Sequence, residues 1–133
     1  MLKKILWVVC ALVLFAMLAA LILPILGVGL FVYAEFFEVT PVCSEVSPDQ
    51  HYTVYLDEIG SPQWPFGPVK ARLTVEGPGG KVIDRCTFWL NNDGGCVYDF
   101  NLKATLWYPD RVEIVMHGAD DRENTVYTLW LTR

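Results

Sequence analysis

The chain is poor in the residues that build catalytic and metal centres. It has two histidines, His51 and His117, and four cysteines, none of them in a C-x-x-C pair. Neither histidine lies in a recognised nucleophile motif, and structural zinc needs four ligands at characteristic spacing. The acidic loops lack the EF-hand pattern that binds calcium. We therefore expect a protein that is not an enzyme and holds no metal or cofactor.

Basic charge is also scarce. Of ten Lys and Arg residues, Lys3 and Lys4 precede a long apolar run. The rest of the chain contains eight basic and fifteen acidic residues, a net charge of −7. Nucleic-acid binding depends on clustered Lys and Arg. This balance excludes nucleic acid as an expected partner.

Residues 5–33 contain no charged side chain. This run of 29 residues exceeds the ~20 that cross a bilayer as a helix and the ~7–15 apolar residues of a cleaved signal. We expect a retained anchor over residues 1–34, although the small-residue spacing at 32–34 leaves cleavage as an alternative. Positive charge stays on the cytoplasmic side. Lys3 and Lys4 before the run and Glu35 after it therefore predict a single-pass cell-membrane protein with its C-terminal domain extracytoplasmic.

Beyond the anchor the chain has no helical period. Residues 35–50, punctuated by two prolines, are predicted as a stalk leading into a β-domain at 51–133. Alternation of apolar and polar residues, interrupted by turn formers, is typical of antiparallel strands with one buried face. The prediction is an all-β fold, a compact antiparallel β-sandwich or twisted meander of about six strands, preceded by one transmembrane helix. The expected strands are 51–59, 69–76, 81–90, 96–107, 111–117 and 125–132.

In the fourth of these strands, residues 96–107, the apolar side chains alternate throughout. We expect this set to face the core: Cys96, Tyr98, Phe100, Leu102, Ala104 and Leu106.

The stretch "CTFWLNNDGGC" at 86–96 brackets a turn with two cysteines. If Asp93-Gly94 is a two-residue hairpin turn, Cys86 and Cys96 lie about 16 Å apart at ~3.3 Å per residue, too far for a disulfide. A wider loop allows the bridge, and the oxidising exterior favours it. We expect a Cys86–Cys96 disulfide. The alternatives are a disulfide between Cys43 and one of these two cysteines, or buried free thiols.

Two stretches, "SPDQHYTVYLDEIG" at 47–60 and "LWYPDRVEIVMHG" at 106–118, together resemble a family of short bacterial single-pass membrane proteins. These proteins have an "SPDGKY"-type first strand and a "W-x-x-D-x-V-x-I" strand near the end. The chain departs from the first pattern at Gln50 and His51, and it keeps Trp107 and Asp110 of the second. The family is uncharacterised, so the resemblance implies an extracytoplasmic β-domain and no activity.

Aromatic residues are the best candidates for a binding surface, because Trp and Tyr are enriched where partners bind. The loop "GSPQWPFGP" at 60–68 is stiffened by proline and carries Trp64 and Phe66. Three Thr-x-Trp triplets place Trp89, Trp107 and Trp130 opposite apolar neighbours, which predicts a stripe outside the core. The alternative for both features is packing, with the loop as a plug and the tryptophans closing one end of the domain.

These observations predict a membrane-tethered extracytoplasmic binding domain without catalysis, whose partner is a protein or another component of the cell envelope. One specific form of this function is an immunity or exclusion protein. The alternative is a small cell-envelope hydrolase or glycan-binding accessory that uses the aromatic stripe and nearby carboxylates.

Overall fold

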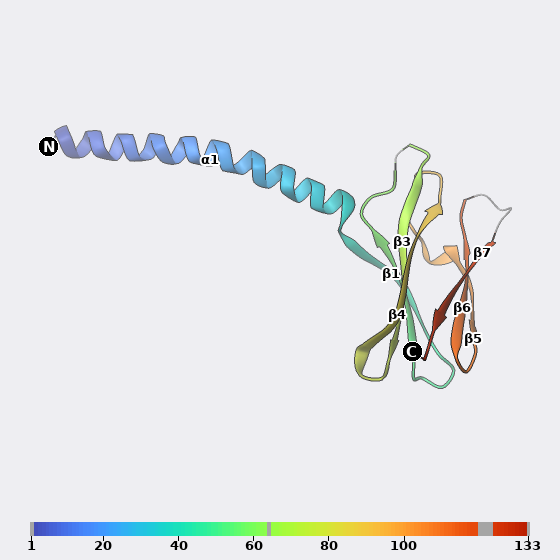
Figure 1. Cartoon of the computed structure of the whole chain (residues 1–133). Helices are drawn as coiled ribbons and strands as arrows, with labels where there is room; N and C mark the ends of the chain where they lie inside the picture. Colours follow the sequence, from blue (N-terminus) through green and yellow to red (C-terminus); the bar gives the residue numbers. More distant parts are fainter. Residues whose placement is uncertain (1, 64, 120–123, 133) are drawn as a thin grey trace.

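The chain forms one long helix followed by two antiparallel sheets (Figure 1). The structure is a computed structural model that describes residues 2–63, 65–119 and 124–132. Helix α1 (Leu2–Phe36) runs 35 residues, continues through Pro24 and buries none of its side chains against the domain. It is long and apolar enough to cross a membrane. The predicted N-terminal apolar helix is confirmed.

Seven strands follow among the described residues, and each sheet is a meander in which strands adjacent in the sequence pair. Such short antiparallel connections are expected where hairpin turns join alternating strands. Sheet A contains β1 (Val39–Val46), β2 (Thr53–Ile59), β3 (Pro68–Gly77) and β4 (Lys81–Asn91). Sheet B contains β5 (Leu102–Trp107), β6 (Arg111–His117) and β7 (Asn124–Trp130). The part of the chain after the helix is therefore mostly β, as predicted.

Strand β1 lies inside the segment that was predicted as a stalk. It pairs with β2 along its length, with a bulge between Pro41 and Cys43. Proline cannot donate a ladder hydrogen bond, which normally argues against a strand. β1 is an edge strand, where one side of the backbone needs no partner, so Pro41 is tolerated there. The structure thus has one strand more than the six expected.

The two sheets share one hydrophobic core. On β6 the side chains alternate between buried and more exposed positions, and on β2 and β3 they alternate until a run of three consecutive buried residues in each strand. Burial of apolar surface at about 25 cal/mol per Å² is the main stabilising term for such a domain. The buried cluster draws from both sheets and comprises Val54, Leu56, Val69, Ala71, Leu73, Val75, Phe88, Leu90, Val97, Val112, Ile114, Met116, Leu129 and Leu131.

The face predicted for residues 96–107 is wrong, except that Leu102 packs against the core as expected. Strand β5 begins only at Leu102, and its pairing with β6 shifts register between Leu102 and Ala104. A bulge of this kind moves every later side chain to the other face. Leu106 is therefore exposed, whereas Trp107 packs against the core. Before the strand, Val97 is buried, while the flanking set of Cys96, Tyr98 and Phe100 is exposed.

The predicted Asp93-Gly94 turn forms, but no hairpin follows it. Both residues have positive φ, 54° and 75°, and Gly95 N–H donates to Asn92 O at 2.8 Å, as in a type I′ turn. A Cβ on Gly94 would collide with the backbone of Pro65, so glycine is needed here. The chain then crosses to the other sheet instead of pairing with β4.

A buried amide holds this crossing in place. Asn101 is fully buried, and its Nδ2 donates to His117 O at 2.7 Å and to Asn92 Oδ1 at 3.2 Å. Its Oδ1 accepts from Tyr98 N–H at 2.8 Å. Glu58 of β2 accepts from Val97 N–H at 2.5 Å. Buried polar groups must be paired, so this network fixes the path between the sheets.

The predicted disulfide is wrong, because all four cysteines lie among the described residues and all are free. Cys43 and Cys86 occupy one cross-strand row of sheet A, with Leu56 and Leu73 between them. Three strand spacings of ~4.8 Å separate them by about 14 Å, twice what a disulfide spans. Cys96 lies beyond the Asp93-Gly94 turn and is exposed, which also corrects its expected place in the core.

Candidate partner-binding site

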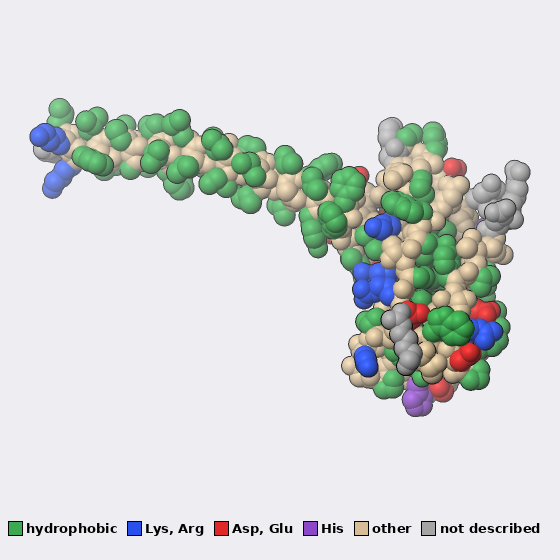
Figure 2. Space-filling model, in the orientation of Figure 1, with side chains coloured by type: hydrophobic (Ala, Val, Ile, Leu, Met, Phe, Trp, Pro, Cys, Tyr) green, Lys and Arg blue, Asp and Glu red, His purple; other side chains and the backbone are tan. Residues whose placement is uncertain are grey.

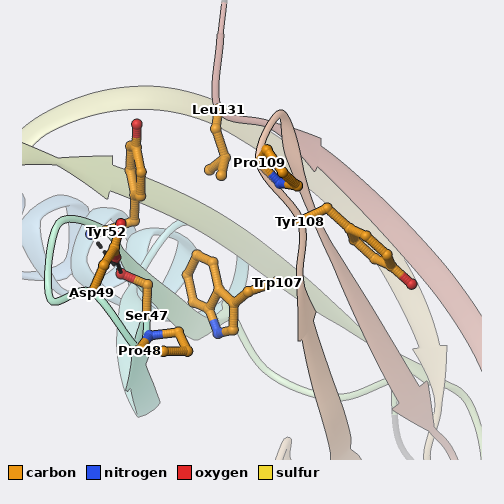
Figure 3. A pocket seen from close by; sticks show the side chains of 8 residues that line it. All are labelled: Ser47, Pro48, Asp49, Tyr52, Trp107, Tyr108, Pro109 and Leu131. Atoms are coloured by element: carbon orange, nitrogen blue, oxygen red, sulfur yellow. Dashed lines mark hydrogen bonds between the residues drawn. The ribbon is translucent and has the colours of Figure 1, made fainter.

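The two sequence stretches of the family resemblance meet in space. The turn between β1 and β2 and the turn between β5 and β6 line a cavity of about 300 Å³, with Leu131 closing one side. We name it the Trp107 cavity; its lining residues are Ser47, Pro48, Asp49, Tyr52, Trp107, Tyr108, Pro109 and Leu131. In Figure 3 the indole of Trp107 lies between Pro48 and Leu131, and Tyr108 points away from the cavity. The lining is mainly aromatic and apolar, with one carboxylate at its edge.

The β1–β2 turn is held by its own side chains. Ser47 Oγ donates to Asp49 Oδ1 at 2.5 Å and accepts from Tyr52 N–H at 2.9 Å. His51 N–H donates to the same Asp49 oxygen at 3.2 Å. These bonds stabilise the carboxylate and lower the pKa of Asp49, with the Ser47 hydroxyl as the largest cause. Asp49 therefore stays ionised and sets the shape of the turn.

Ser47, Asp49 and His51 do not form a nucleophilic triad. In such a triad the serine hydroxyl donates to a histidine that acts as its base. Here the hydroxyl donates to the aspartate, and His51 Nδ1 contacts Asp49 O at 2.8 Å. The arrangement is that of a capped turn, in which Gln50 takes a positive φ of 62°.

Next to the cavity, the outer face of sheet B exposes apolar side chains. Trp130 of β7 pairs with Arg111 of β6, and the Arg111 guanidinium lies 4.3 Å from the centre of the Tyr108 ring. Arg111 is also bonded to Glu113 at 2.8 Å and to Asp110 at 3.2 Å. We name as the sheet B patch the exposed residues Leu106, Tyr108, Val126 and Trp130. Tyr108 belongs to both features, so the cavity and the patch are continuous.

The tryptophans predicted to bind a partner do not form one stripe. Trp107 points into the core side of sheet B, whereas Trp130 lies on its outer face and is 49% exposed. Trp89 is exposed on the outer face of sheet A, near the end of helix α1. A common stripe required β4, β5 and β7 to be neighbours, and β4 belongs to the other sheet.

The loop at 60–68 lies near Trp89 rather than near the cavity. Phe66 is 75% exposed, and the loop is tied to the Asp93-Gly94 turn by Gly94 N–H donating to Gly67 O at 2.9 Å. Its exposure favours display over the plug alternative for Phe66. The prediction for Trp64 falls outside the described residues. Partner binding by these aromatics remains a prediction.

Sequence reasoning missed the cavity residues Ser47, Pro48, Asp49 and Tyr52 and the patch residues Leu106, Tyr108 and Val126. For the cavity a signal existed, since the two stretches of the resemblance contain all but one of its lining residues. For the patch the signal was misleading, because the β5 bulge turns Leu106 outward.

The cysteines and carboxylates do not assemble into a reactive centre in the described part of the chain. No group of three or more His, Cys, Asp or Glu residues there is placed to hold a metal. Burial raises the pKa of the Cys43, Cys86 and Cys96 thiols, and the Glu58 carboxylate adds to the effect at Cys96. A raised pKa keeps a thiol protonated and weakly nucleophilic.

Comparisons with protein-family models, with curated proteins and with solved structures give no match for the chain.

Proposed function

We propose that the chain is a single-pass membrane protein whose extracytoplasmic β-sandwich binds a protein partner through the sheet B patch and the adjoining Trp107 cavity, without catalysis. The observation that carries the proposal is the patch itself. Leu106, Val126 and Trp130 leave 46%, 54% and 49% of their surfaces exposed on one sheet face. Large apolar side chains gathered and exposed on one face of a domain are typical of interaction sites.

The chemistry of the patch suits a protein rather than a small ligand. Its residues spread over β5, β7 and the turn before β6, and the Arg111–Glu113 pair lies on the central strand β6, between Leu106 and Trp130. The centres of protein interfaces are enriched in aromatic residues and arginine. Trp130 is the expected anchor, since tryptophan is enriched among residues that dominate binding energy. An immunity or exclusion protein is one specific form of this function.

The proposed orientation follows from charge. Lys3 and Lys4 precede the helix, and Glu35 and Glu38 follow its apolar run. The positive-inside rule then places the β-domain on the outer side of the cell membrane. Helix α1 supplies the span on which this orientation depends.

The test is photo-crosslinking from a benzophenone amino acid placed at Val126 of the full chain in intact cells. The matched control position is Thr87, which is exposed on sheet A. We expect a discrete protein adduct from position 126 that Trp130→Ser weakens about 30-fold or more, as loss of an anchor residue does. An equal adduct from position 87, or none from position 126, contradicts the assignment.

The glycan-binding alternative is supported by a different observation, the Trp107 cavity. An indole beside Tyr52 and the Asp49 carboxylate offers both stacking and hydrogen bonding. Soluble cell-wall fragments are the probe. Trp107→Phe keeps an aromatic ring that can stack on a sugar, and Trp107→Ala removes it; the folding of both variants is checked. Saturable binding that Trp107→Phe retains and Trp107→Ala loses would favour this function over the first.

A further inference from the structure

The outer face of sheet A is basic although the domain is acidic. Its adjacent cross-strand rows carry Lys70, Arg72 and Arg85, together with Trp89. Arg72 is bound to Asp57 of the same face, Nη2 to Oδ2 at 2.7 Å. Glu76 lies at the far end of β3 on this face, so Lys70 and Arg85 leave it with an excess of one positive charge. Lys70 Nζ lies 6.0 Å from the centre of the Trp89 ring. We name this surface the basic face.

The end of helix α1 is fixed against this face. Ser61 N–H donates to Glu35 O at 2.8 Å, and Gly60 N–H donates to Glu38 O at 2.7 Å. Gly60 has a φ of 67°, and any Cβ there would collide with Glu35 O, so glycine permits the close approach. The last helical turn and the row Ile59, Lys70 and Trp89 line a common cavity of about 850 Å³.

This attachment places the basic face on the side of the domain from which helix α1 leaves (Figure 1). In Figure 1 the helix runs across the strand direction and leaves from the sheet A side, while sheet B lies on the far side. Figure 2 shows basic side chains on the flank next to the helix end, and most acidic side chains of that view lie farther away. The 29-residue apolar run is about 43 Å long at 1.5 Å per residue. That matches a bilayer with its headgroups, ~40–45 Å, and leaves no long spacer before the domain.

We propose that the basic face docks on the headgroup layer of the membrane that helix α1 spans, with Lys70 and Arg85 bound to anionic lipid and Trp89 in the interface. The inference rests on the proposed single-pass tether. Tryptophan is enriched at this depth of the membrane, and each basic residue near an anionic surface adds to the attraction. The domain then lies on its side, with the sheet B patch directed away from the lipid.

The test is lysine acylation with a water-soluble reagent on the full chain in nanodiscs, with and without phosphatidylglycerol, and in detergent micelles. Peptide mass spectrometry compares Lys70 with Lys103, an exposed lysine on β5. We expect phosphatidylglycerol to slow Lys70 about fivefold and to leave Lys103 unchanged. Arg85→Glu should restore the reactivity of Lys70, and the charge-matched Lys103→Glu should not.

Equal changes at Lys70 and Lys103, or the same protection of Lys70 without phosphatidylglycerol, would overturn the inference. Co-elution of the chain with the nanodiscs is measured in the same samples. A chain that fails to co-elute refutes the membrane tether and with it the proposed function. A chain that co-elutes with Lys70 unprotected refutes the docking alone.

Discussion

Replacing Asn101 by alanine should destabilise the domain more than any other single amide change. Asn101 is fully buried and bonds to Tyr98 N–H, to His117 O and to the Asn92 side chain. Alanine removes the acceptor of Tyr98 N–H and the donor to His117 O and to Asn92 Oδ1 in the interior. Each unsatisfied buried group costs about 1–3 kcal/mol, and partial relaxation makes the sum smaller than the maximum. We expect a loss of about 3–5 kcal/mol against a typical total stability of ~5–15 kcal/mol.

The assay is urea unfolding of the full chain in detergent micelles, followed by tryptophan fluorescence. Asn91→Ala is the matched control, because Asn91 is exposed and adjacent to the network residue Asn92. Its effect should stay within ~0.5 kcal/mol. If Asn101→Ala costs less than about 1 kcal/mol, other hydrogen bonds compensate for those of Asn101, and the network does not fix the crossing between the sheets.

Three further outcomes are expected. Thr105→Val should leave stability unchanged or raise it by up to about 1 kcal/mol, because the buried Thr105 Oγ1 has no hydrogen-bond partner among the described residues. A loss of stability in the same urea assay would contradict this. Alkylation of the unfolded chain should modify the same number of thiols with and without reductant, by intact mass, since the cysteines are free; two fewer without reductant would reveal a disulfide. The lowered pKa of Asp49 contributes stability that is present above the ordinary aspartate pKa of ~3.9 and lost as the pH falls through the lower folded-state value. Asp49→Asn should remove that part of the acid dependence, and an unchanged acid profile would contradict it.

The architecture was largely predictable because local signals agreed with it. The apolar run, the alternating strands at 53–59 and 69–76 and the Asp93-Gly94 turn all appear where the pattern placed them. Each depends on neighbouring residues alone: helix length, side-chain period and backbone freedom at one turn.

The candidate site was less predictable because it depends on contacts between distant residues. A single bulge near Lys103 reversed the faces of Leu106 and Trp107. The alternation of apolar and polar residues does not indicate where a bulge will form. The Asp93-Gly94 turn indicated a hairpin, yet Asn101 and Glu58 direct the chain to the other sheet. The expected disulfide is wrong for the same reason. The distance between two cysteines depends on how the strands pair, and their spacing in the sequence does not determine it.

Both proposed surfaces depend on the proposed outward orientation of the domain, and labelling of Cys96 tests this orientation most directly. Cys96 is exposed on the β-domain, whereas Cys10 lies within helix α1. Intact cells are treated with a membrane-impermeant maleimide at mildly alkaline pH, which offsets the raised pKa of Cys96, and the labelled peptide is identified by mass spectrometry. We predict that Cys96 is labelled before the cells are lysed. Labelling of Cys96 only after lysis would place the domain in the cytoplasm and contradict the proposed function.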